Sequence, residues 1–138
     1  MHADMRMVHR AGAIALFLLL AGCDLVAPDN STSVSGSWGG VGTNLTVSHD
    51  TTYWHYECIV GSLPLAIQLS ADGSFLAQGT VTGATFRGQP LRLYGAVQAD
   101  SMHLYYQVQD GHGSWAAPGV SLLVRGQAAT DPGILCID

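Results

Sequence analysis

The chain has 138 residues, of which 48% are hydrophobic and 11% are charged, and this length and composition fit one folded domain rather than a disordered chain. Its formal net charge at pH 7 is −5, with 10 Asp and Glu against 5 Lys and Arg, which excludes the basic surface that nucleic acids require. All five basic residues are Arg, so the lack of Lys excludes Schiff-base chemistry and a P-loop lysine.

Residues 1–22 have the pattern of a bacterial lipoprotein signal peptide. Arg6 and Arg10 give a positive start, and the apolar run over 11–20 is too short to cross a bilayer as a helix. The run ends in Leu-Ala-Gly-Cys, which resembles a lipobox with Cys23 as the lipidated residue, although an ordinary secretory signal with a chance cysteine is the alternative. We expect Cys23 to carry acyl chains such as palmitate, which anchor the protein to a membrane.

An anchored chain of this kind belongs to the bacterial cell envelope, on the periplasmic side of the inner or the outer membrane. Residues 23–37 are rich in Ser, Thr, Pro and Gly, and they predict a flexible tether. The folded domain is therefore expected at 38–138. Its membrane contact is expected to run through the N-terminal lipid.

Two cysteines remain once Cys23 is assigned to the lipid. Cys58 and Cys136 are 78 residues apart, and the expected compartment is oxidising, so one disulfide is predicted between them. In the chain-entropy model, a disulfide that closes such a loop adds about 4.5 kcal/mol to the free energy of unfolding. The chain has no C-x-x-C pair and no neighbouring His at metal-ligand spacing, so a redox pair or a metal site is disfavoured.

The remainder of the chain alternates between apolar and polar residues with the period of β-strands. Strands are predicted over 43–48, 52–59, 65–69, 75–81, 91–97, 102–108 and 120–124. The sequence Ala-Asp-Gly-Ser at 71–74 predicts a hairpin that pairs 65–69 with 75–81. Gly95 is expected where backbones approach closely. The fold class is predicted to be all-β, a small antiparallel meander of about seven to eight strands that forms a barrel or a sandwich and contains one disulfide.

The ordered pieces of this domain resemble a family of small, uncharacterised bacterial secreted proteins and lipoproteins. They are Trp38-Gly39-Gly40, Glu57-Cys58, Gly61 with Pro64-Leu65, Asp72-Gly73-Ser74-Phe75, Gly79-Thr80, Met102 with Leu104, and Leu123-Val124-Arg125-Gly126 before Cys136. This resemblance implies the fold and the disulfide but no activity.

A looser resemblance links the chain to the bacterial C-type lysozyme inhibitors, which are also small barrel lipoproteins. It rests on Tyr56-Glu57-Cys58 near the start of the domain and on the partner cysteine near its end. Those inhibitors block the lysozyme cleft with a Ser-Gly-x-x-x-Tyr type loop. Residues 110–115 contain Gly and Ser but no following Tyr, and the basic residue expected to meet the carboxylates of the enzyme is missing.

Five side chains form the candidate interaction surface: Tyr53, His55, Glu57, Tyr105 and His112. The first three share one face of a strand, opposite Trp54 and Tyr56. Tyr105 and Tyr106 are adjacent, so one ring must lie on each face, and an exposed aromatic ring marks a contact surface. A polar strand face and aromatic cross-strand pairs are the plainer interpretations of the same residues.

These observations predict binding rather than catalysis, because nucleophile and phosphate-loop patterns are lacking. We expect a protein-interaction module, with an inhibitor-like role as its narrowest form. A lipocalin-like barrel that binds a small ligand is the alternative. A hydrolase that uses His55 and Glu57 is the third and least favoured hypothesis. No cofactor and no metal are expected.

Overall fold

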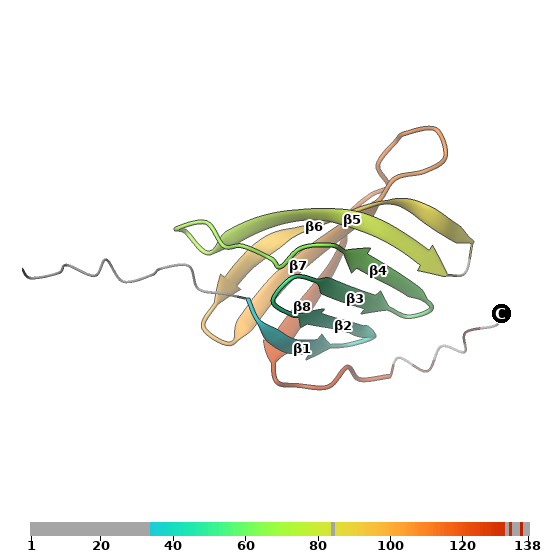
Figure 1. The fold of residues 1–138 in the computed structure, drawn as a ribbon. Helices are drawn as coiled ribbons and strands as arrows, with labels where there is room; N and C mark the ends of the chain where they lie inside the picture. The colour runs from blue at the N-terminus through green and yellow to red at the C-terminus, as the bar shows by residue number, and fades with distance from the viewer. Residues whose placement is uncertain (1–33, 84, 132, 134–135, 137–138) are drawn as a thin grey trace, which may run out of the picture.

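The computed structural model describes residues 34–83, 85–131, 133 and 136, and they form a closed eight-stranded antiparallel barrel (Figure 1). The strands follow one another round the barrel in chain order, and β8 pairs with β1 to close it. Their bounds are β1 Gly36–Gly40, β2 Thr43–Val47, β3 Thr52–Tyr56, β4 Ile59–Leu63, β5 Ser74–Gly83, β6 Phe86–Gln98, β7 Ser101–Val108 and β8 Gly119–Arg125. The predicted all-β fold class is confirmed, as a barrel and not a sandwich.

Strict alternation of side chains produces the interior of the barrel. On β3, Trp54 is buried while its neighbours Tyr53 and His55 are exposed, and on β7 Leu104 is buried beside exposed Tyr105. Every strand contributes in this way, because successive side chains of a strand lie on opposite faces. The buried apolar side chains form one continuous core: Val34, Trp38, Leu45, Val47, Trp54, Leu63, Ile67, Phe75, Ala77, Val81, Leu91, Leu93, Met102, Leu104, Val108 and Leu123.

Two glycines leave room for the largest rings inside the barrel. A Cβ atom on Gly61 would lie 2.9 Å from the Trp54 ring, and one on Gly119 would lie 2.1 Å from the Tyr106 ring. The large rings fill the space that the glycines leave, because small barrels combine small and large side chains in their interior. The close backbone approach predicted at Gly95 is also present, since a Cβ there would lie 1.9 Å from the His103 carbonyl oxygen.

The strand predicted at 65–69 is wrong. The sheet ladder between β4 and β5 joins only residues 60–62 to 80–82, and β5 pairs along its full length with β6. Pro64 follows β4 directly and has no N–H to continue a ladder. Residues 64–70 instead run on from β4 to the turn before β5 outside the strands, and Ile67 is buried in the core. The apolar alternation of this segment therefore reflects packing of Ile67 and Leu69 against the core, not pairing in a sheet.

Both ends of the domain are attached to β1. Val34 is completely buried, and its carbonyl oxygen accepts a hydrogen bond from the Trp38 indole at 3.1 Å, so the barrel packing begins four residues before the predicted boundary at 38. After β8 the chain runs back along the outside of the barrel (Figure 1). It passes β1 so closely that a Cβ on Gly39 would lie 2.3 Å from the Gln127 carbonyl oxygen. Within the described residues no helix has the length and apolar character that a membrane crossing requires.

Candidate functional site

The predicted disulfide between Cys58 and Cys136 is present, with a Cα–Cα distance of 5.2 Å. It ties the C-terminal segment to the turn that joins β3 and β4. Two hydrogen bonds hold the same segment further back, because the Gly42 amide donates to the Thr130 carbonyl at 2.8 Å and the Thr130 amide donates to the Gly40 carbonyl at 3.0 Å. The segment is therefore fixed at both of its ends to the outer wall of the barrel.

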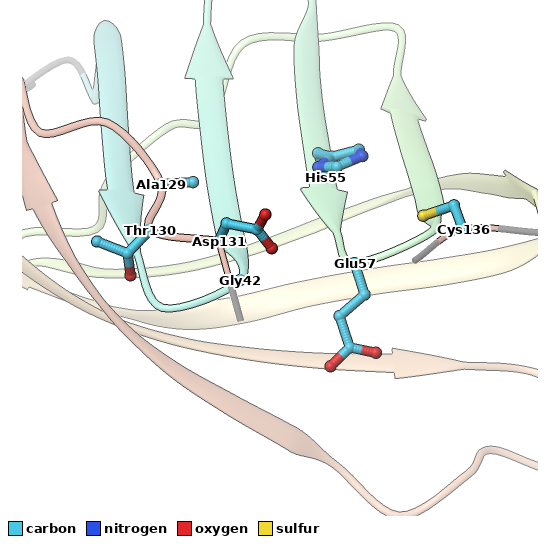
Figure 2. Close-up of a pocket in the computed structure, with 7 residues that line it drawn as sticks. All are labelled: Gly42, His55, Glu57, Ala129, Thr130, Asp131 and Cys136. Atoms are coloured by element: carbon cyan, nitrogen blue, oxygen red, sulfur yellow. The ribbon is translucent and has the colours of Figure 1, made fainter. Parts of the chain in front are cut away.

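A cavity of about 310 Å³ lies between this segment, the turn before β2 and the outer face of β3 (Figure 2). Its lining is Gly42, His55, Glu57, Ala129, Thr130, Asp131 and Cys136. Strand β3 projects His55 outwards, and the C-terminal segment supplies Asp131 from the opposite side. In Figure 2 the Glu57 side chain extends away from His55 at the mouth of the cavity.

Glu57 has an unusual backbone conformation. Its φ angle is +50°, and its amide donates a hydrogen bond to the Gly42 carbonyl at 3.0 Å. A left-handed conformation is uncommon for a residue other than Gly, and strained positions of this kind cluster at functional sites. The turn ends the alternation of β3, so Glu57 does not continue the strand face that His55 occupies. It lies instead at the corner where the strand, the turn and the C-terminal segment meet.

The carboxylates at this cavity have no cationic partner within the described residues. Among the described residues, the ion pair is between Arg125 and Asp100, at 3.3 Å, and it lies on another part of the surface. Asp131 accepts a hydrogen bond from the Gly133 amide at 2.7 Å, which orients one of its oxygen atoms. The cavity therefore offers negative charge and an imidazole to an incoming group. No set of three metal-ligating side chains gathers among the described residues.

The five predicted surface residues do not form one patch. Tyr53, His55 and Glu57 lie together along β3 and the turn after it. Tyr105 lies on β7, four strands away round the barrel, where its ring stacks on Tyr94 with centroids 5.3 Å apart. His112 is exposed in the loop between β7 and β8, and its amide donates to the Asp110 carboxylate at 2.8 Å.

The sequence interpretation did not include Thr130 and Asp131, although a signal for them existed. A disulfide from Cys58 to Cys136 requires the residues before Cys136 to approach the turn that contains Glu57. Any polar residue in that stretch was therefore a candidate neighbour of His55 and Glu57. Cys23 and most of the predicted tether lie outside the described residues.

A second group of polar and aromatic side chains lies inside one end of the barrel. The Trp54, Tyr56 and Tyr106 rings pack together, with the Tyr106 centroid 4.8 Å from Trp54 and 4.9 Å from Tyr56. Beside them the Thr43 and Ser121 hydroxyl groups share a hydrogen bond of 2.8 Å. Burial, and then hydrogen bonding to Tyr56, raise the pKa of Tyr106 above its usual value. The Trp54 indole N–H is buried and has no hydrogen-bond acceptor among the described residues.

Comparison of the chain with protein families, with curated proteins and with solved structures finds no match. The resemblance to lipoprotein families therefore stays a prediction, and the argument about function rests on the barrel and its surfaces.

Proposed function

We propose that this protein is a lipid-anchored binding protein of the bacterial cell envelope, and that it contacts a protein partner through the cavity beside His55. One observation carries this proposal. The carboxylates of half-buried Glu57 and exposed Asp131 lie at a cavity that the disulfide and two backbone hydrogen bonds hold open on the barrel surface. A preformed cavity with a few polar groups is the usual form of a binding site.

The chemistry of the cavity favours a cationic side chain as the bound group. Guanidinium and ammonium groups form charge-assisted hydrogen bonds with carboxylates, and these bonds are stronger than those between neutral groups. A partner that inserts Arg or Lys between Glu57 and Asp131 would supply the missing positive charge. The net acidity of the chain would also steer a basic partner towards it.

The proposal is tested by measuring binding to a C-type lysozyme, because the narrowest form of the proposed role is that of a lysozyme inhibitor. The mature chain from residue 23 is measured with the enzyme by calorimetry, alone and as the Glu57→Gln/Asp131→Asn double variant. Asp50→Asn, in the turn between β2 and β3, is the matched control because it removes a charge at the other end of the barrel. We expect at least tenfold weaker binding for the double variant and no change for the control.

Equal affinity of the double variant and the control would contradict the role of the cavity. Binding that is too weak to measure for the unsubstituted chain would contradict the inhibitor-like version. Membrane anchoring is tested separately, by incorporation of labelled palmitate into the full chain expressed in a bacterium. The Cys23→Ser variant is expected to lose the label, and a labelled variant would contradict the anchor.

A lipocalin-like carrier is the second candidate, and the unpaired Trp54 N–H is the observation that favours it. A buried donor without an acceptor costs about 1–3 kcal/mol, which a bound polar ligand would recover. Tyr56, Tyr106 and Thr43 surround the same end of the barrel and would supply further hydroxyl groups. Against this candidate, large side chains occupy the interior, and the 310 Å³ cavity is on the outer wall.

A further inference from the structure

The outer faces of β5, β6, β7 and β8 carry a row of apolar side chains that nothing in the described chain covers. Leu76, Tyr94, Tyr105 and Val120 lie directly opposite one another in the registers of these four neighbouring strands. Leu122 lies two residues further along β8. Leu76 is 66% exposed, Val120 60% and Leu122 55%, and we call these five residues the apolar belt.

The belt differs from the scattered apolar residues of an ordinary surface because it is continuous across four strands. The other face of the same strands already fills the core, so at the belt these strands carry apolar side chains on both faces. Contiguous exposed apolar surface marks a contact with a partner or a membrane. Stacking of Tyr94 on Tyr105 fixes two aromatic rings in the middle of the belt.

The charges round the belt identify the kind of surface that fits it. Strands β5 to β8, like β1 to β4, contain no Asp and no Glu, so no carboxylate of a strand borders the belt. They do contain Arg92, which borders the belt next to Tyr94 and lies over the Trp115 ring at 4.3 Å. A shallow hollow of about 330 Å³ opens between Leu76 and Arg92. Apolar and aromatic residues beside a basic group are typical of surfaces that contact anionic bilayers.

The position of the chain terminus supplies an independent argument, which rests on the lipid anchor of the proposed function. Only ten residues lie between Cys23 and Val34, and covalent geometry limits the distance between these two residues to about 40 Å. A domain of this size has a radius of gyration of about 13 Å. The chain enters the barrel beside β8, because the Arg125 guanidinium donates to the Ser35 carbonyl at 2.9 Å. A lipid on Cys23 would therefore hold the belt within reach of the bilayer.

We propose that the apolar belt docks the barrel onto the surface of an anionic phospholipid bilayer. Leu76, Val120 and Leu122 enter the interface between headgroups and acyl chains, and Tyr94 and Tyr105 lie at headgroup level. Arg92 attracts the phosphate groups. On the opposite side of the barrel, the His55 cavity then faces away from the membrane and stays open to a partner.

The proposal is tested by flotation with vesicles of phosphatidylethanolamine and phosphatidylglycerol, using the mature chain with Cys23→Ser so that no lipid anchor contributes. The belt variant Leu76→Gln/Val120→Thr/Leu122→Gln is compared with the matched variant Val60→Thr/Leu65→Gln, which removes exposed apolar groups from and beside β4. We expect the unsubstituted chain and the matched variant to float equally. The belt variant is expected to partition at least fivefold less. An unchanged urea midpoint shows that each variant folds.

Three results would overturn the proposal: no flotation of the unsubstituted chain, equal flotation of the belt and matched variants, or a dimer in vesicle-free solution that only the belt variant abolishes. The last result would assign the belt to a second copy of this chain. Because Cys23 is replaced throughout, a failure here is distinct from a failure of the palmitate experiment.

Discussion

The two halves of the barrel wall turn the same kind of side chain inwards but present different surfaces outwards. The wall of β2, β3 and β4 has short strands and a partly polar outer face, and the C-terminal segment covers part of it. The wall of β5 to β8 has longer strands and carries the apolar belt on its outer face. Inward positions therefore explain the fold, whereas outward positions distinguish a proposed partner site from a proposed membrane surface.

If the inward positions of the two halves are equivalent, truncating a buried side chain should cost a similar amount of stability in either half. Trp54→Ala on β3 and Leu104→Ala on β7 each remove a completely buried side chain. We expect each to lower the free energy of unfolding by about 3–4 kcal/mol. Their outward neighbours are the controls, and Tyr53→Ala and Tyr105→Ala are expected to cost about 0.5 kcal/mol. Urea unfolding measures all four, and equal losses at inward and outward positions would contradict the alternation.

Removal of the disulfide separates the two halves more selectively. The Cys58→Ala/Cys136→Ala variant is expected to lose up to about 4.5 kcal/mol of stability, because its unfolded chain is no longer cross-linked. Amide NMR signals of His55 and Thr130 should shift, since the disulfide closes their cavity, while those of Tyr94 and Tyr105 should not. Shifts spread equally over both halves would show that the disulfide organises the whole barrel and not the cavity alone.

Tyr106 links the two halves inside one end of the barrel, and high pH tests that contact. Its pKa is raised in the folded state, so the unfolded chain loses the phenolic proton first as the pH rises above 10. Stability from this group is present below pH 10 and is lost as the pH rises from there through the folded-state pKa. We expect Tyr106→Phe to reduce the slope of stability against pH by up to about 1.4 kcal/mol per pH unit. An identical slope in urea titrations at pH 10–11 would contradict the buried contact.

The smallest effect is expected at the turn where the chain passes from the β4 side to β5. The Asp72 carboxylate accepts hydrogen bonds from the Ser74 hydroxyl at 2.6 Å and the Ser74 amide at 3.0 Å, and the hydroxyl contact is the main cause of its lowered pKa. The stabilising effect is present above the ordinary pKa of 3.8 and is lost as the pH falls through the lower, folded-state value. Asp72→Ala should therefore lower the urea midpoint slightly at pH 7 and by less at pH 2. An equal difference at both pH values would contradict this.

Alternation made most of the barrel predictable, because each strand has one buried face. From the sequence alone, Trp54 was placed on the strand face opposite Tyr53, and Tyr53 and Tyr105 were placed on the outer surface. The segment 65–69 was misassigned because its alternation has the same period whether the residues pair in a sheet or pack on the core as an unpaired segment. Strands β1 and β4 were missed because their glycines, such as Gly61, interrupt the apolar pattern while making room for rings.

The candidate site was less predictable, because it depends on contacts between distant parts of the chain. His55 and Glu57 were identified by their spacing, but Asp131 joins them only through the path of the C-terminal segment. The apolar belt was hidden for a similar reason. Leu76, Tyr94, Tyr105 and Val120 are spread over 45 residues of sequence, and only the strand registers place them in one row.

Native mass spectrometry of the mature chain tests most directly whether the protein acts through its outer surface. The chain is produced with Cys23→Ser and exported to a periplasm, so that the disulfide can form. We predict a bare protein two hydrogens lighter than the reduced chain, because side chains fill the interior. A small molecule that is bound in a one-to-one ratio and released on denaturation would contradict this account if the Glu57→Gln/Asp131→Asn variant also retains it. The ligand would then lie outside the outer cavity, and a carrier would be favoured.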